Sequence, residues 1–185
     1  MTELKHYIDA FSHLHTAVVK GHKAPHKAVL LLAVIDMVEE ERIVNNHIHL
    51  SEELERRFRD IWNRYLGNSA VFSPDITKPF FHMQHEGFWW LVEKKEEEGV
   101  MVAEEYEGCR KEKKALPGGY SLKAMRSAFE YAEIDPMLFM LLREKDARAM
   151  LRVVLINTYL ANQPTKTMPD LQLIIAALPL LTMVG

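Results

Sequence analysis

The segment Ala28–Ile35 is apolar at every position. A helix without a polar face has to be buried, because each of its sides would otherwise expose apolar side chains to water. Pro25 lies just before the segment, and proline suits the start of a helix, where the backbone N–H has no partner inside the helix. The sequence therefore predicts a helix over about residues 26–41 at the centre of a packed core.

Helices are also predicted on either side of this central segment. Apolar residues recur at spacings of three and four over residues 4–19, a pattern typical of an amphipathic helix. Ser51 is a good N-cap and is followed by acidic residues, which indicates a helix that runs to about Leu66. Three more helices are predicted later in the chain, over residues 121–132, from Asp135-Pro136 onward, and over 146–160.

Two stretches are predicted to form β-structure. Residues 43–50 alternate in side-chain character, as in a short strand. Residues 79–92 contain two aromatic-rich runs around Glu86-Gly87, which predicts a β-hairpin that turns at the glycine. The expected fold class is therefore mainly α with a small antiparallel β-sheet (α+β). The order helix, buried helix, strand, helix, hairpin further indicates a winged-helix-like core followed by a C-terminal helical region.

Composition divides the chain into four parts. The apolar patterns of residues 1–95 predict a core unit, whereas residues 96–119 are rich in Glu and Lys, which is typical of a charged linker or loop. Residues 120–161 are predicted to form a helical connector. Residues 162–185 contain three prolines and little amphipathic order, and they are expected to form an irregular C-terminal tail.

The cysteine content and the apolar runs limit where the protein is expected to act. Cys109 is the single cysteine of the 185 residues, so the chain can form no internal disulfide and no Cys-based zinc site. The longest apolar run, within residues 171–184, is too short to span a membrane. The protein is therefore predicted to be cytoplasmic, with no membrane partner.

No motif for catalysis or for cofactor binding occurs in the sequence. It contains no G-x-S-x-G, no phosphate-binding glycine loop and no H-E-x-x-H zinc motif. His47 and His49 share one face of the predicted strand, but no third ligand lies close to them in the sequence, so they are interpreted as exposed strand residues. The sequence thus predicts no catalytic residue, no metal site and no cofactor.

Basic residues gather in three segments: at the start of the buried helix, on the helix after Ser51, and around Pro79. These residues are Lys23, His26 and Lys27, then Arg56 and Arg59, then Lys78 and His82. If the three segments converge, they form a positive groove that attracts phosphates. Alternatively, the arginines pair with acidic residues of their own helix, and spacing alone favours this pairing.

Three motifs occur in a fixed order along the chain. They are His26-Lys27-Ala28-Val29-Leu30-Leu31-Leu32, Lys78-Pro79-Phe80-Phe81-His82 and Gly87-Phe88-Trp89. Together they resemble the DNA-binding domain that precedes the HNH nuclease module in bacterial restriction endonucleases. That group includes the sulfur-binding domains of enzymes that act on phosphorothioate-modified DNA. Residues 133–142 and 155–160 resemble the helical connector of these enzymes, so the resemblance spans about residues 20–160.

The resemblance implies a non-catalytic DNA-binding module whose core is residues 1–95. The implied partner is double-stranded DNA, including phosphorothioate-modified DNA. With the basic segments, the expected DNA-binding residues are Lys23, His26, Lys27, Arg56, Arg59, Lys78, Pro79 and His82. Four of them, His26, Lys27, Pro79 and His82, are expected to lie in one surface region.

The sequence departs from the family pattern in two ways. Ala28 stands where the family has proline and Lys78 where it has tyrosine, so DNA binding carries over better than sulfur recognition. Residues 162–185 contain no His and no Cys, so the nuclease module is expected to be absent, as in a truncated endonuclease or a stand-alone reader. Two alternatives stay open: a regulatory or scaffold protein that self-associates, for instance as a homodimer, and a metal-dependent nuclease.

Overall fold

The structure, a computed structural model, describes residues 3–67, 69–94, 119–161 and 163. Within these residues the fold is mainly helical with two small antiparallel sheets, as expected for the α+β class. The elements are α1 (Glu3–Ser12), β1 (Val18–Val19), β2 (His22–Lys23), α2 (His26–Glu39), β3 (His47–Ile48), α3 (Glu52–Leu66), α4 (Thr77–His82), the short 3-10 helix η1 (Met83–His85), β4 (Trp89–Glu93), α5 (Leu122–Ala128), β5 (Phe129–Ile134), α6 (Pro136–Arg143), α7 (Lys145–Leu155) and the short π-helix η2 (Ile156–Leu160).

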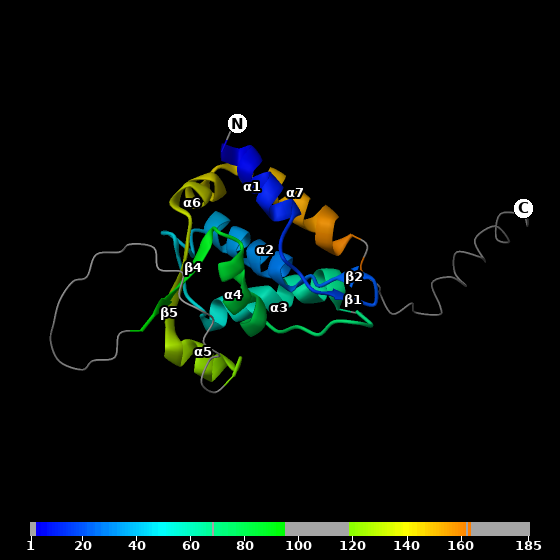
Figure 1. Cartoon of the computed structure of the whole chain (residues 1–185). Helices are drawn as coiled ribbons and strands as arrows, with labels where there is room; N and C mark the ends of the chain where they lie inside the picture. Colours follow the sequence, from blue (N-terminus) through cyan, green and yellow to red (C-terminus); the bar gives the residue numbers. More distant parts are fainter. Residues whose placement is uncertain (1–2, 68, 95–118, 162, 164–185) are drawn as a thin grey trace, which may run out of the picture.

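Helix α2 forms the centre of the core, as its uniformly apolar sequence predicts. Every side chain from Ala28 to Ile35 is at most 3% exposed. Helices α3, α4, α6 and α7 all contact α2. In Figure 1, α1 and α7 lie above α2, while α3 and α4 lie below it. The central position of this helix is therefore confirmed.

The main sheet has three antiparallel strands in the order β3-β5-β4. The last of these strands in the sequence, β5, is the middle strand of the sheet. Its Ile134 lies opposite Trp89 of β4, and its Ala132 lies opposite Ile48 of β3. All four of these side chains are buried. The sheet therefore packs its buried face against the helical core (Figure 1).

The predicted β-hairpin over residues 79–92 is wrong. Its first half is helical, since α4 and η1 occupy Thr77–His85, and its second half, β4, pairs with β5 instead. Ile76, Phe80 and Met83 recur at helical spacing and are all buried, a signal that the aromatic content of the segment obscured. Pro79 is compatible with α4 because it lies in the first turn, where backbone N–H groups have no partner inside the helix.

Three other predicted boundaries differ from the structure. Helix α1 ends at Ser12, and the following residues form the β1–β2 hairpin, whose turn residues Lys20 and Gly21 both have positive φ, as a tight two-residue turn requires. The helix predicted over 121–132 ends at Ala128, where the chain continues as β5. The strand predicted over 43–50 is reduced to His47–Ile48.

The helical region after the sheet is confirmed. The Asp135 carboxylate accepts a hydrogen bond of 2.8 Å from the backbone N–H of Met137, with Pro136 as the first helical residue of α6. Helix α7 and η2 then cover the residues for which a helix over 146–160 is predicted. Of the helices described, none has the length and apolar character that a membrane crossing requires.

Candidate nucleic-acid interface

Three of the expected DNA-binding residues meet around one small hollow in the surface. The hollow has a volume of about 190 Å³ and lies between α3, the start of α4 and the residues that precede α5. Arg59 of α3 lines it directly. Lys78 and His82 of α4 adjoin it, because Asp75 and Tyr120 in its wall contact them. We call Arg59, Lys78, His82, His85 and Tyr120 the α4 surface.

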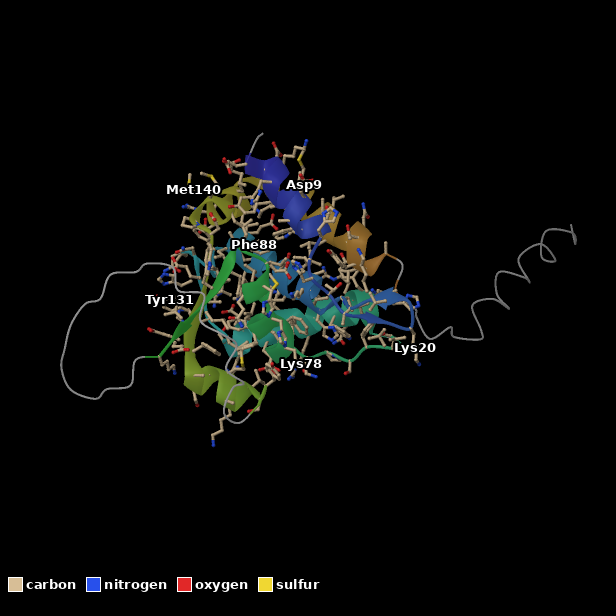
Figure 2. The ribbon with its side chains drawn as sticks, viewed as in Figure 1. Asp9, Lys20, Lys78, Phe88, Tyr131 and Met140 are labelled. Atoms are coloured by element: carbon tan, nitrogen blue, oxygen red, sulfur yellow. The ribbon has the colours of Figure 1, made fainter. Side chains whose placement is uncertain are left out.

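Helix α4 and η1 present a basic and aromatic face to solvent. Lys78, His82 and His85 are four and three residues apart, so they lie on the same side of the helical segment. The Lys78 side chain is 65% exposed, with its ammonium 3.8 Å from the Asp75 carboxylate. The His82 ring lies 5.8 Å from the His85 ring and 5.3 Å from the ring of Tyr120. Figure 2 shows Lys78 at the lower side of the molecule.

Ion pairs neutralise part of the positive charge of the α3 arginines. The sequence favoured pairing with acidic residues of the same helix over a fully open positive groove. Arg59 pairs with Glu55 one turn earlier, although its side chain remains 62% exposed. Arg57 instead pairs with Glu40, beyond the end of α2. Arg56 is exposed, and within the described part of the chain it has no ion-pair partner within 4.0 Å. The arginine side chains of α3 therefore divide between structural ion pairs and open positive charge.

His26 is held in place by the loop that leads to α4. Its Nε2 is 2.9 Å from the carbonyl oxygen of Ser73, and its ring packs on Trp62 and Phe72. Burial among these groups lowers the pKa of His26 below its usual value, because it removes water from the charged form. His26 is half-buried, and its contacts with the loop fix the loop's position and occupy Nε2.

Lys27 is buried, contrary to the expectation that it lies on an exposed surface. Its side chain is 8% exposed, and its ammonium forms an ion pair with the Glu86 carboxylate, which is 3% exposed. Glu86 also accepts hydrogen bonds of 3.1 and 3.3 Å from the backbone N–H of His15. A buried ammonium requires such a partner because an isolated charge in the core is very costly. The position of Lys27 is therefore explained by the ion pair.

Pro79 and Lys23 also lie apart from the exposed basic face. Pro79 is buried in the first turn of α4, so the predicted surface region containing His26, Lys27, Pro79 and His82 does not form. Lys23 lies on β2, with its ammonium 5.5 Å from the ring centroid of Tyr159. Its hairpin occupies the right side of Figure 2, where Lys20 is labelled, whereas Lys78 lies lower and nearer the centre.

Sequence reasoning missed Tyr120, His85 and Glu86. Tyr120 is separated from α4 by more than thirty residues, and nothing in its local pattern shows that its ring lies 5.3 Å from those of Phe81 and His82. Once residues 77–85 are recognised as helical, the spacing from Lys78 and His82 predicts that His85 lies on the same face. Glu86 could be identified only as a turn residue beside Gly87.

The paired histidines on the sheet do not form a metal site with other described residues. The His47 ring stacks on Tyr131 at 4.0 Å, and His49 packs edge-on against the same ring at 5.6 Å. No group of three or more His, Cys, Asp or Glu with a metal-binding arrangement occurs among the residues that the structure describes. These histidines therefore serve as packing partners of Tyr131.

Comparison with known proteins adds no assignment to this geometry. No protein family matches the chain, and no curated protein matches its sequence.

Proposed function

We propose that this chain is a non-catalytic DNA-binding module that contacts the phosphate backbone through the α4 surface. The observation that carries the proposal is the convergence of Arg59, Lys78 and His82, from two helices, around the hollow lined by Asp75 and Tyr120. Cations on neighbouring helices can neutralise successive phosphates, and each neutralised phosphate releases condensed counterions. Because the net charge of the chain is −3, such binding has to depend on a local surface.

The resemblance to the DNA-binding domain of HNH restriction endonucleases supports this proposal. The motif segments, although far apart in sequence, are linked to one another: Lys27 pairs with Glu86, and the Trp89 Nε1–H donates to the Phe80 carbonyl oxygen at 3.1 Å. These contacts give the shared motif residues a common role in holding α2, α4 and β4 together. In a winged-helix-like arrangement, the β3-β5-β4 sheet would take the place of the wing.

The α4 surface lacks the features that phosphorothioate recognition requires. A phosphorothioate keeps the backbone charge but adds a large and poorly hydrated atom, so its reader needs an apolar surface beside cations. Pro79 is buried, and Lys78 replaces the tyrosine of the family pattern. We therefore propose ordinary duplex DNA as the principal ligand, with little preference for sulfur.

A titration of duplex binding against salt tests the proposal. Fluorescence anisotropy with a 20-base-pair duplex, repeated from low to physiological salt, is expected to give an affinity that falls steeply, with log Kd linear in log salt. A matched phosphorothioate duplex is expected to bind with nearly the same affinity. The absence of binding at low salt would reject the DNA-binding function.

A second candidate function, self-association as a regulatory or scaffold protein, is favoured by one observation. The α6 and α7 helices expose large apolar side chains, with Met140, Met150 and Val153 each more than half exposed. Exposed apolar side chains mark an interaction surface where they form one contiguous patch. Light scattering during size-exclusion chromatography distinguishes the two candidates: a stable homodimer without DNA binding supports the scaffold.

A further inference from the structure

We infer that the 190 Å³ hollow beside the α4 surface takes a single unpaired nucleobase of the bound DNA, an inference that rests on the proposed function. Pockets for drug-sized ligands usually have volumes of about 300–1,000 Å³. The hollow is smaller than that range, so its size suits one planar ring system rather than a whole nucleotide. Its place beside Arg59 and Lys78 puts such a ring next to groups that can hold the flanking phosphates.

The hollow has an aromatic and apolar wall. Tyr120 is 39% exposed, so its ring is accessible to a ligand while remaining partly packed. Its inner side is supported by Phe81, whose ring centroid lies 5.3 Å away at an interplanar angle of 67°. Phe58 and Leu122 continue the wall. Every nucleobase has a π face, so a supported and accessible ring of this kind can stack on a base of any sequence.

The lining of the hollow also includes groups that can recognise the edge of a base. Arg59 supplies N–H donors and Asp75 supplies a carboxylate acceptor, whereas the Glu55 carboxylate is already paired with Arg59 and Arg126. Asp75 Oδ1 already accepts from the backbone N–H and the hydroxyl of Thr77, at 2.9 and 2.6 Å, which fixes the carboxylate in place. A carboxylate has acceptor capacity for further donors.

The Asp75 carboxylate predicts which bases the hollow prefers. Adenine, cytosine and guanine each carry an exocyclic amino group that can donate to Asp75, whereas thymine has none. Thymine has only its ring N–H as a donor, and the two carbonyl oxygens that flank this group would be repelled by the carboxylate. We therefore expect adenine, cytosine and guanine to bind above thymine, with stacking on Tyr120 providing most of the gain in affinity over fully paired DNA.

The experiment compares four duplexes of one sequence context: fully paired, with one extra unpaired adenine, with one extra unpaired thymine, and with an abasic residue at the same bulge. The abasic bulge has the same flexibility but no base, so it separates stacking from bending. Wild-type protein is expected to bind the adenine bulge about tenfold more tightly than the paired and abasic duplexes, as base stacking on an aromatic side chain allows. The thymine bulge is expected to fall between them.

Variants at Tyr120 assign the preference to the hollow. Tyr120→Ala is expected to reduce the adenine-bulge affinity to that of the paired duplex, and Tyr120→Phe, which keeps the ring, is expected to retain the preference. Equal binding of all four duplexes by wild-type protein, with a steep salt dependence, would overturn the nucleobase site but leave the DNA-binding module intact. A preference that survives in Tyr120→Ala would also overturn it, whereas no binding to any duplex would reject the proposed function as well.

Discussion

Lys27, in the first turn of α2, forms a buried ion pair with Glu86, which lies 59 residues later in the turn before β4. The pair joins the central helix to the sheet through two charges that water cannot reach. A buried pair of this kind adds little net stability compared with apolar residues of similar shape, but the loss of one partner leaves an uncompensated charge in the core. Its main effect is therefore to fix how these two segments meet.

The first prediction concerns this ion pair. Lys27→Met removes the ammonium and is expected to lower the free energy of unfolding by about 3–5 kcal/mol, because the Glu86 carboxylate stays buried without its partner. The double variant Lys27→Met/Glu86→Gln keeps acceptor capacity for the His15 N–H and is expected to recover much of the loss. Urea denaturation followed by circular dichroism measures both. Equal stability of Lys27→Met and wild-type protein would contradict the ion pair.

The second prediction separates the exposed lysine of the α4 surface from a lysine elsewhere. Lys78→Glu is expected to weaken DNA binding for all sequences and to reduce the salt slope by about one, as the loss of a phosphate contact does. Lys145→Glu makes the same change in charge at the start of α7, which lies across α2 from α4 in Figure 1. If the two variants bind DNA equally, the α4 surface is not the site of contact.

The third prediction concerns pH and His26. Burial holds the pKa of folded His26 below its unfolded value of about 6.5, so the unfolded chain binds more protons as the pH falls through that value. Stability contributed by neutral His26 is therefore present above about pH 6.5 and decreases below it. Urea denaturation at pH 7.5 and 5.5 is expected to show a larger decrease for wild-type protein than for His26→Gln. The same decrease in both would contradict a lowered pKa of folded His26.

The fourth prediction concerns the turn between η1 and β4. Gly87 has φ +78°, and no atom outside its neighbours lies within 4 Å of the position that a Cβ would take. Gly87→Ala is therefore expected to cost about 1–2 kcal/mol through backbone strain alone. Gly87→Asn should cost less, since asparagine tolerates the left-handed region better. Thermal unfolding of the three proteins gives the order, and a destabilisation by asparagine as large as that by alanine would contradict this explanation.

The parts of the fold that follow from local patterns were predicted, and the parts that depend on distant pairing were not. The apolar run at Ala28–Ile35 and the N-caps Ser51 and Asp135 identify their helices, since each signal lies within one or two turns. The pairing of β4 with β5 joins residues about forty positions apart, and no local signal specifies it. The aromatic residues of 79–92 favoured strands by propensity, but their buried positions have helical spacing.

The candidate site was predicted only in part, because local patterns identify residue types but not which distant residues meet. Residue types identified Arg59, Lys78 and His82 as cations that could face DNA, but their meeting point depends on Tyr120 from another part of the chain. For Lys27 the prediction was wrong: this lysine, next to His26, was expected on the surface, but its side chain is buried in the core. Burial of a charged side chain depends on its partner, and the partner here is 59 residues away.

The strand order β3-β5-β4 has a consequence for how the chain assembles. Both outer strands precede the middle strand in sequence, so during synthesis β3 and β4 emerge from the ribosome before the only described strand with which either pairs. Until residues 129–134 are made, β3 and β4 have no sheet partner for the backbone groups that will pair with β5. Trp89 and Ile48 also lack the strand that lies opposite them in the finished sheet. Closure of the sheet must therefore wait for β5, and a fragment that stops at residue 95 would carry two edge strands without the strand that joins them.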